Sequence, residues 1–397
     1  MVARRAVGVV AAGAAVALGS RLVGRAMVAR AERRHCPTAN LPPFTASARA
    51  HALHRELRVV DLHADSLLWG RDLMRRGDQG QVDVPRLIEG NVALQVLAVS
   101  TKVPRRANME RNDDRTDDVT LLGIAAGWPP RTWVNLLERA LHLASRADAL
   151  AAGSRGQFSL IRSRGDLTAY LEQRNTNPGT TAGLLSIEGA HALDDDPANL
   201  EAVLDAGFRM MSLTHLFDNH FGGSAHGIAK GGLTPTGREV IERMEAGGMI
   251  VDMAHASVAT IDDILTIATR PVVASHTGVQ GTADNTRNLS DAHLRAIADT
   301  GGLIGIGFWP AATGGDDVAA IARAIRYATD VAGFDHVGLG SDFDGAVVQP
   351  IDATGMVQVT DALLESGFSD DQVAAVMGGN AIRVLAEALP DRARVRP

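Results

Sequence analysis

Short apolar runs rich in β-branched residues recur along the chain, separated by longer segments whose apolar positions follow helical spacing. Apolar runs bounded by polar residues are typical of strands buried in parallel sheets. Eight strands are predicted, at Val59–Leu62, Val92–Val99, Leu184–Ile187, Met210–Leu213, Met249–Met253, Pro271–Ser275, Leu303–Gly307 and Val337–Gly340. Helices are predicted at Thr132–Ala147, Leu200–Ala206, Thr236–Ala246, Val258–Ala268, Ser290–Asp299 and Val318–Ala332.

Eight alternations of strand and helix in one segment favour a closed (β/α)8 TIM-type barrel over a doubly wound sheet. The segment from Ser100 to Gly183 is too long for one strand–helix unit, and we expect it to hold two helices and an irregular loop. Within it, Arg105–Asp118 is charged and is expected to face solvent. The barrel is assigned to residues 51–390, after a proline-containing linker (36–50) and before a C-terminal tail (391–397).

Polar side chains suited to metal binding or proton transfer follow several of these runs. They are His63, Asp65, Glu188, His255, His276 and Asp342. The carboxyl ends of barrel strands form the active face of this fold, so these groups should converge there. His63 and Asp65 form an H-x-D pair that can point toward one cation. Glu188 can bridge two cations, and His255 and His276 can hold the second. Three His, one Asp and one Glu suit a pair of divalent metals, which predicts a metallohydrolase.

The first 35 residues differ from the rest. Arg4 and Arg5 precede an uncharged apolar stretch, Ala6–Ser20, and further arginines follow it. This order predicts a signal peptide, loosely of the twin-arginine type, or an uncleaved signal-anchor. The alternative interpretation, an ordinary amphipathic helix, is disfavoured because the stretch has no polar face. We therefore expect an exported or inner-membrane-anchored bacterial protein on the periplasmic or extracytoplasmic side, with membrane contact only through this segment.

Composition narrows the function further. The 397 residues carry a formal charge of −7, which offers no basic face for nucleic acid. Cys36 is the only cysteine, so an intrachain disulfide and a cysteine-based metal site are both excluded. We expect Cys36 to be an unpaired surface thiol.

Over roughly residues 55–390 the sequence resembles the membrane (renal) dipeptidase family of binuclear zinc peptidases, peptidase family M19. The resemblance is carried by Asp61-Leu62-His63-Ala64-Asp65, Val82-Asp83-Val84-Pro85-Arg86-Leu87, Ile187-Glu188-Gly189, Leu213-Thr214-His215, Asp252-Met253-Ala254-His255, Ser275-His276-Thr277, Thr286-Arg287-Asn288 and Gly340-Ser341-Asp342-Phe343-Asp344.

The resemblance implies two zinc ions per chain and a dipeptide substrate, and it leans toward a homodimer. In the matching positions His63 and Asp65 would hold one zinc, His255 and His276 the other, and Glu188 would bridge them. His215 would contact the scissile carbonyl, Arg287 would bind the substrate carboxylate, and Asp342 would transfer protons. The loop after His215 departs from the animal members of the family, so side-chain preference is left open. In this loop His220 and His226 are interpreted as pocket-lining or solvated residues.

The residues also suit the peptide hydrolysis that the resemblance implies. Two cations sharing a water would lower its pKa from about 15.7 toward about 7, giving a nucleophile at neutral pH.

Two alternatives are weighed against a dipeptidase. Another amidohydrolase-type enzyme would show H-x-H on the first strand and often a carboxylated lysine. A membrane-tethered barrel that binds ligands without turnover would lack a metal ligand or proton carrier, and none is missing here.

Overall fold

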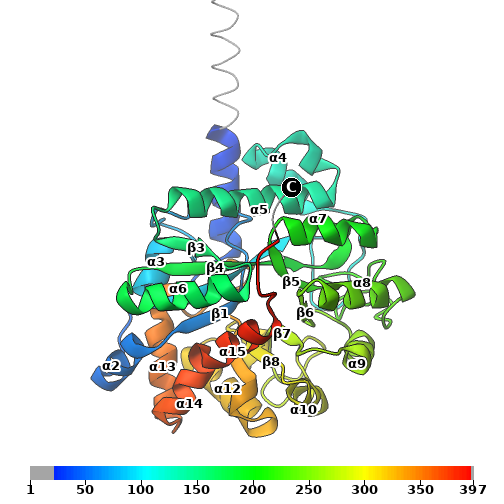
Figure 1. Cartoon of the computed structure of the whole chain (residues 1–397). Helices are drawn as coiled ribbons and strands as arrows, with labels where there is room; N and C mark the ends of the chain where they lie inside the picture. Colours follow the sequence, from blue (N-terminus) through cyan, green and yellow to red (C-terminus); the bar gives the residue numbers. More distant parts are fainter. Residues whose placement is uncertain (1–21, 395–397) are drawn as a thin grey trace, which may run out of the picture.

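Eight parallel strands pair edge to edge and close into a ring surrounded by helices (Figure 1). This computed structural model describes residues 22–394. Around the ring the strand order is β2-β1-β9-β8-β7-β6-β5-β4, and pairing of β2 with β4 completes the closure. The predicted (β/α)8 barrel is confirmed.

All eight predicted strands are present, with ends that differ by a few residues. The barrel strands are β1 (Val59–Ala64), β2 (Val92–Ser100), β4 (Thr181–Glu188), β5 (Phe208–Ser212), β6 (Ile250–Asp252), β7 (Val273–Thr277), β8 (Leu303–Ile306) and β9 (Val337–Leu339). A further short strand, β3 (Phe158–Leu160), pairs with the first residues of β4 and was not predicted.

The helices cover the outside of the ring (Figure 1). They are α2 (Ala48–Glu56), α3 (Val84–Glu89), α4 (Asp118–Ala126), α5 (Leu136–Gly153), α6 (Arg164–Thr176), α7 (Leu200–Asp205), α8 (Pro235–Ala246), α9 (Val258–Ile267), α10 (Asp291–Asp299), α11 (Pro310–Thr313), α12 (Val318–Ala332), α13 (Met356–Glu365), α14 (Asp370–Ala374) and α15 (Asn380–Ala388). Each predicted helix is present within a few residues. The helix α2 begins inside the segment that was predicted to be a linker.

The prediction of two helices between Ser100 and Gly183 is wrong, because three helices and β3 occupy this segment. The predicted helix at Thr132–Ala147 corresponds to α5, whereas α4 and α6 had no predicted range. The sequence of α4 is apolar on most sides and therefore lacks an amphipathic pattern. Asp117 caps this helix by accepting a hydrogen bond from the backbone N–H of Val119.

The core has an inner and an outer part. Side chains from seven barrel strands, among them Val60, Leu94 and Leu184, form one buried cluster with Leu385 of α15. A second cluster fills the space between the strands and the outer helices. The interior of the barrel is therefore filled by side chains, and the barrel acts as a packed scaffold.

The described part of the N-terminal helix covers residues 22–35 and stands beside α4 (Figure 1). The apolar stretch at residues 6–20 and the arginine pair before it lie outside the described residues. Among residues 22–394, no helix is both long enough and apolar enough to cross a membrane.

Cys36 is not a surface thiol, contrary to the prediction. It is buried and its Sγ lies 3.3 Å from the carbonyl oxygen of Asp344. The chain buries it because the following residues pair with the segment at Gln349, where the backbone N–H of Ala39 donates to the Gln349 carbonyl at 2.7 Å.

Candidate active site

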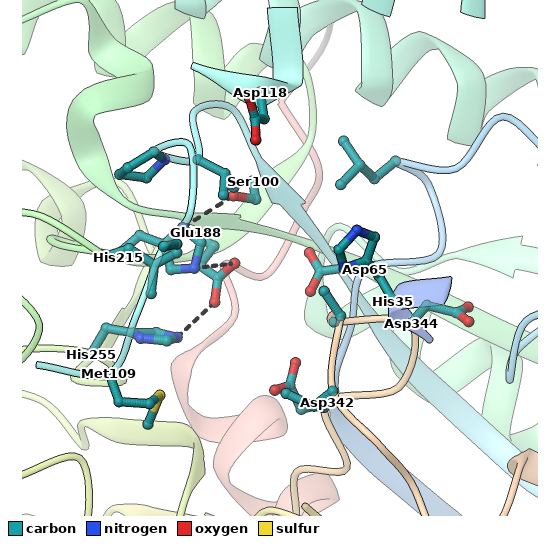
Figure 2. A pocket seen from close by; sticks show the side chains of 18 of the residues that line it. His35, Asp65, Ser100, Met109, Asp118, Glu188, His215, His255, Asp342 and Asp344 are labelled. Atoms are coloured by element: carbon teal, nitrogen blue, oxygen red, sulfur yellow. Dashed lines mark hydrogen bonds and ion pairs between the residues drawn. The ribbon is translucent and has the colours of Figure 1, made fainter. Parts of the chain in front are cut away.

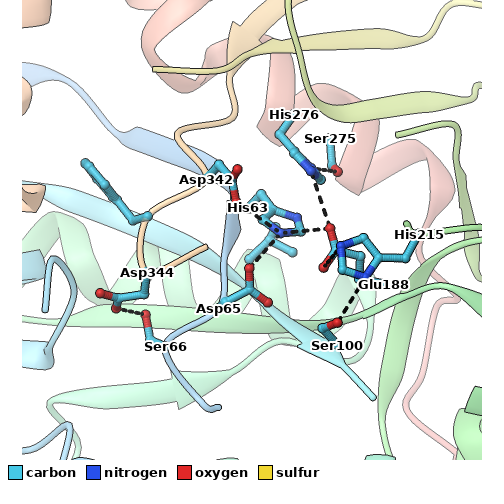
Figure 3. Close-up of polar contacts among 12 residues, drawn as sticks. His63, Asp65, Ser66, Ser100, Glu188, His215, Ser275, His276, Asp342 and Asp344 are labelled. Carbon is cyan, nitrogen blue, oxygen red and sulfur yellow. Dashed lines mark hydrogen bonds and ion pairs between the residues drawn. The ribbon is translucent and has the colours of Figure 1, made fainter. Parts of the chain in front are cut away.

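The residues singled out from the sequence gather at the carboxyl end of the strand ring (Figure 3). His63 and His276 are the penultimate residues of β1 and β7, and Glu188 is the final residue of β4. Asp65 follows β1, while the others lie in the loops after β5, β6, β7 and β9, namely His215, His255, Arg287 and Asp342. The structure therefore brings all eight predicted site residues together.

The carboxylate of Glu188 lies at the centre of the histidines. Its Oε1 atom is 2.9 Å from His255 Nε2, 3.4 Å from His276 Nε2 and 3.6 Å from His63 Nε2. Its Oε2 atom is 3.4 Å from His215 Nε2. One oxygen of Glu188 thus lies close to His63, His255 and His276, the histidines expected to hold the two cations, and the other lies close to His215.

A second group of ligands surrounds His63. Its Nε2 atom is 3.4 Å from Asp65 Oδ2 and 3.9 Å from Asp342 Oδ1. These three residues could together hold one metal ion, and so could His63, Glu188 and His276. A third such group consists of Glu188, His215 and His255.

Hydrogen bonds behind His255 determine which of its nitrogens faces the cavity. The Nδ1 atom of His226 lies 2.8 Å from the carbonyl oxygen of Met109, which can only accept, so this nitrogen carries the proton. Burial lowers the pKa of His226 to about 4, so it is neutral and its Nε2 accepts. That Nε2 lies 3.1 Å from His255 Nδ1, which must therefore donate. The Nε2 lone pair of His255 then points toward Glu188.

His276 is held in the same way from another side. Its Nδ1 atom lies 2.9 Å from Ser275 Oγ, and that hydroxyl donates to Asp252 Oδ2 at 2.5 Å. The hydroxyl can then accept a hydrogen bond from His276 Nδ1, which leaves the Nε2 lone pair directed inward. Metal-binding histidines are commonly fixed by such partners of the second ring nitrogen.

The donor atoms fit divalent cations. Two imidazole lone pairs and a carboxylate oxygen repel one another at these distances unless a cation lies between them. Buried ligand atoms also lack partners, since His63 Nδ1, His63 Nε2 and Asp65 Oδ1 have no hydrogen bond to any described residue. Uncompensated buried polar atoms of this kind are costly unless a ligand satisfies them.

The electrostatics lead to the same conclusion. Burial disfavours a charged His63, but Glu188 and Asp65 outweigh it and raise the pKa of His63 to about 10. Burial, followed by repulsion from Asp65, raises the pKa of Glu188 well above its usual range. Burial likewise raises the pKa of Asp342 to about 8. The carboxylates thus concentrate negative charge in a buried site, and bound cations would compensate that charge.

Backbone conformation aims two of these groups into the cavity. His255 and Asp342 have φ values of 64° and 63°, in the left-handed region that residues other than glycine rarely adopt. The loop before Asp342 is fixed by Asp61, whose carboxylate accepts hydrogen bonds from Ser341 N at 2.7 Å and Ser341 Oγ at 2.6 Å. Strain at these residues is maintained by the surrounding hydrogen bonds.

A cavity of about 380 Å³ opens directly above these ligands. Figure 2 shows His215 and His255 on one side of it and His35 and Asp65 on the other. Arg287 also lines this cavity, donates one hydrogen bond to the His276 carbonyl, and lies 5.7 Å over the ring of Trp309. Burial lowers the pKa of Arg287 to about 10, so it keeps its charge at neutral pH. Its other N–H groups can bind an anion in the cavity.

The interpretation of His226 as a pocket-lining or solvated residue is wrong. Its side chain is fully buried behind His255, because the loop at 216–227 folds back onto the barrel. His220 is exposed, as that interpretation allowed. The segment at 105–118 is largely exposed as predicted, but Arg106, Asn108 and Met109 also line the cavity.

Several residues of the site could not be found from the sequence. Ser100 Oγ lies 3.1 Å from His215 Nδ1, at the end of β2. His35, Leu68 and Trp309 line the cavity. For Ser100, its position at the end of a predicted strand was the one feature of the sequence that could have indicated a role in the site. His35 reaches the cavity only because the N-terminal helix packs against the barrel.

Comparison with known proteins identifies the family of this chain. The profile of the family described as membrane dipeptidase (peptidase family M19) matches residues 47–395. Dipeptidase tcpJ from Claviceps purpurea is 31% identical over 317 residues, which cover 78% of this chain and 69% of that protein. Dipeptidase aclJ from Aspergillus oryzae is 33% identical over 221 residues, and the match spans about half of each protein (53% and 52%).

Solved structures share the fold. The probable dipeptidase PvdM from Pseudomonas aeruginosa aligns with a TM-score of 0.71 and 21% identity, covering 86% of this chain and 97% of that one. A metallo peptidase from Rhodobacter sphaeroides, solved with a phosphinate mimic of the dipeptide L-Ala-D-Ala, aligns with a TM-score of 0.69 and 23% identity over 84% of this chain and 99% of that one. With the family profile covering most of its length, this chain belongs to the membrane dipeptidase family, peptidase family M19.

Proposed function

We propose that this protein is a metal-dependent dipeptidase that uses two divalent cations, most naturally zinc, to hydrolyse the peptide bond of dipeptides. The observation that carries the proposal is the convergence of His63, Asp65, Glu188, His255 and His276 at the base of the cavity that Arg287 also lines. Relatives named dipeptidases and the structure solved with a dipeptide mimic support the same substrate class.

His63 and Asp65 would hold one cation, His255 and His276 the other, and Glu188 both. When bound, such cations supply Lewis-acid polarisation of the peptide carbonyl and acidify a water molecule. Nitrogen and carboxylate ligands without cysteine suit zinc, although manganese or cobalt could occupy the same ligand set.

Arg287 would select the substrate by its free carboxylate. The guanidinium is buried, charged and anchored through the His276 carbonyl, so its position relative to the ligands is fixed. A carboxylate paired with it places the peptide bond that precedes the last residue near Glu188. A longer peptide would place a neutral peptide group beside Arg287 instead of the free carboxylate. This limits the enzyme to dipeptides and close analogues.

Asp342 and His215 would act on the reacting atoms. A carboxylate oxygen of Asp342 lies 3.9 Å from His63 Nε2 and lines the cavity, where it can take a proton from the attacking water and return it to the leaving amine. Burial lowers the pKa of His215 well below its usual range. A neutral His215 can donate a hydrogen bond to the developing oxyanion.

The location of the enzyme is part of the proposal. The arginines and apolar stretch at the start of the sequence favour export or anchoring at the extracytoplasmic side of a bacterial inner membrane. A homodimer is proposed from the family resemblance alone.

The test is hydrolysis of a dipeptide panel by zinc-loaded protein, with the tripeptides and C-terminal amides of the same sequences as controls. Cleavage of the dipeptides, with at least tenfold lower kcat/KM for the controls, is expected. Equal cleavage of all three classes would exclude the proposed substrate selection, and no cleavage of any would exclude a peptidase.

A further inference from the structure

The N-terminal helix is docked on the barrel although it lies outside the segment that matches the family, residues 47–395. Val28 and Glu32 of this helix are buried, with Glu32 0% exposed. The Glu32 carboxylate pairs with Arg71 and accepts a hydrogen bond from Gln79. A buried ion pair of this kind fixes the position of the helix, because separating its partners would leave a buried charge without a partner.

Arg71 links the helix to the loop that carries Asp342. Its guanidinium pairs with Asp344 as well as with Glu32. Asp344 also accepts hydrogen bonds from Ser66 Oγ at 2.6 Å and from the Gln81 backbone N–H at 2.7 Å. The helix is therefore attached to the rim of the cavity by a fully bonded network and forms a fixed wall.

The helix and α4 together line an apolar groove of about 330 Å³. Its walls include Met27, Val28 and Ala31 of the helix and Leu121, Leu122 and Ala125 of α4. The two helices approach closely, since a Cβ added at Gly24 would lie 2.1 Å from the Ala125 carbonyl oxygen.

This groove is continuous with the cavity above the metal ligands. The two share His35, Leu68, Trp69, Val103, Asp118 and Ala346 as lining residues. His35 is labelled in Figure 2 beside Asp65, at the opposite side of the cavity from His255. A substituent that leaves the cavity past His35 thus enters a space with apolar walls.

The position of Arg287 decides which part of a dipeptide points there. Arg287 contacts the His276 carbonyl and Trp309, whereas Leu68 and Trp69 of the groove follow Asp65. A dipeptide whose carboxylate pairs with Arg287 therefore directs its other residue, the amino-terminal one, toward Asp65 and the groove.

We propose that the N-terminal helix and α4 form an apolar subsite that selects dipeptides with a large apolar side chain on the amino-terminal residue. The inference rests on the proposed dipeptidase function and names its substrate class. Transfer of such a side chain from water into apolar walls favours binding, while a methyl side chain would leave the groove to water.

The experiment compares kcat/KM for Phe-Ala and Ala-Ala with zinc-loaded, full-length protein. Wild type is expected to prefer Phe-Ala. Ala31→Trp and Ala125→Trp fill the groove from its two walls, and each should lower the Phe-Ala to Ala-Ala ratio about tenfold or more. Val23→Trp is the matched control, because Val23 is an exposed residue of the same helix outside the groove, and it should leave the ratio unchanged.

The ratio separates selectivity from damage to the fold, which would lower both values together. Wild type that cleaves both peptides without preferring Phe-Ala would overturn the subsite, and so would an unchanged ratio in both groove variants. Absence of cleavage of both peptides by wild type would instead refute the proposed dipeptidase function on which the subsite depends.

Discussion

The Nε2 atom of His226 lies 3.1 Å from the Nδ1 atom of His255, and the other ring nitrogen of His226 is held by the Met109 carbonyl. This relay leaves the Nε2 lone pair of His255 directed at Glu188, 2.9 Å away. His226 is thus not itself a predicted metal ligand, but it determines which ring nitrogen of His255 is available to bind a cation.

Replacing His226 should therefore weaken metal binding without removing a ligand. His226→Phe fills a similar space but cannot accept the hydrogen bond from His255, so we expect about 10–100-fold lower zinc affinity. Competition with a chromophoric chelator measures this affinity directly. His220→Phe, in the exposed part of the same loop, is the control and should bind zinc like wild type. Unchanged affinity in His226→Phe would show that the relay does not orient His255.

Glu188→Gln should disturb both cations. Its two oxygens face different histidines, and a neutral amide offers one weaker acceptor in place of a bridging carboxylate. Elemental analysis should find about two zinc ions in wild type and clearly fewer than two in the variant after identical dialysis. An active wild type holding a single tightly bound metal would contradict the bridging role.

Asp342→Asn should leave zinc content near the wild-type value while lowering kcat by about 10²–10⁴, the usual range for a lost acid–base group. The isosteric amide preserves packing in the strained loop but cannot carry the proton. Metal analysis and steady-state kinetics on the same preparation separate the two effects. If zinc is lost in parallel with activity, Asp342 acts chiefly as a ligand of the group formed with His63 and Asp65.

Arg287→Ala should erase discrimination between a dipeptide and its C-terminal amide. Wild type should cleave the amide at least tenfold less efficiently, because a hydrogen bond to a charged group contributes about 1.5–3 kcal/mol. The variant should lose efficiency on the free acid and approach a ratio of one. The measurement is kcat/KM for both substrates on both enzymes. Equal efficiency in wild type would remove Arg287 from the substrate site.

Stability should fall as the pH drops below neutrality, partly because of His54, which lies far from the metal ligands. Burial lowers the pKa of His54 to about 4, while its ring nitrogens contact Thr360 Oγ1 at 2.8 Å and the Gly90 carbonyl at 3.1 Å. The unfolded chain, with a histidine pKa near 6.5, binds a proton first. The folded state therefore loses stability as the pH falls from about 6.5 to 4.

Between pH 7 and pH 5 this single residue should account for about 2 kcal/mol of the free energy of unfolding. His54→Gln keeps polar atoms but cannot titrate, so it should lose about that much less stability over the same interval. Urea unfolding at both pH values measures the difference, and His51→Gln on the exposed face of α2 is the control. Equal losses in wild type and His54→Gln would contradict the assignment.

The sequence by itself determined the architecture and most of the metal ligands. Apolar runs such as Val59–Leu62 and Val337–Gly340 are distinctive because barrel strands are buried on both faces, and side chains that follow such runs must meet at one end of a parallel ring. Local order along the chain is thus sufficient to place His63, Asp65, Glu188, His255 and His276 together.

Tertiary structure alone decided the features that join distant segments. His226 follows no strand, and its role depends on a loop that folds behind His255. Cys36 and His35 lie in a segment that the sequence pattern separates from the barrel, yet the buried Glu32–Arg71–Asp344 network brings this segment to the rim of the cavity. Such contacts leave no periodic signal, because they depend on single polar residues whose partners lie tens to hundreds of positions away.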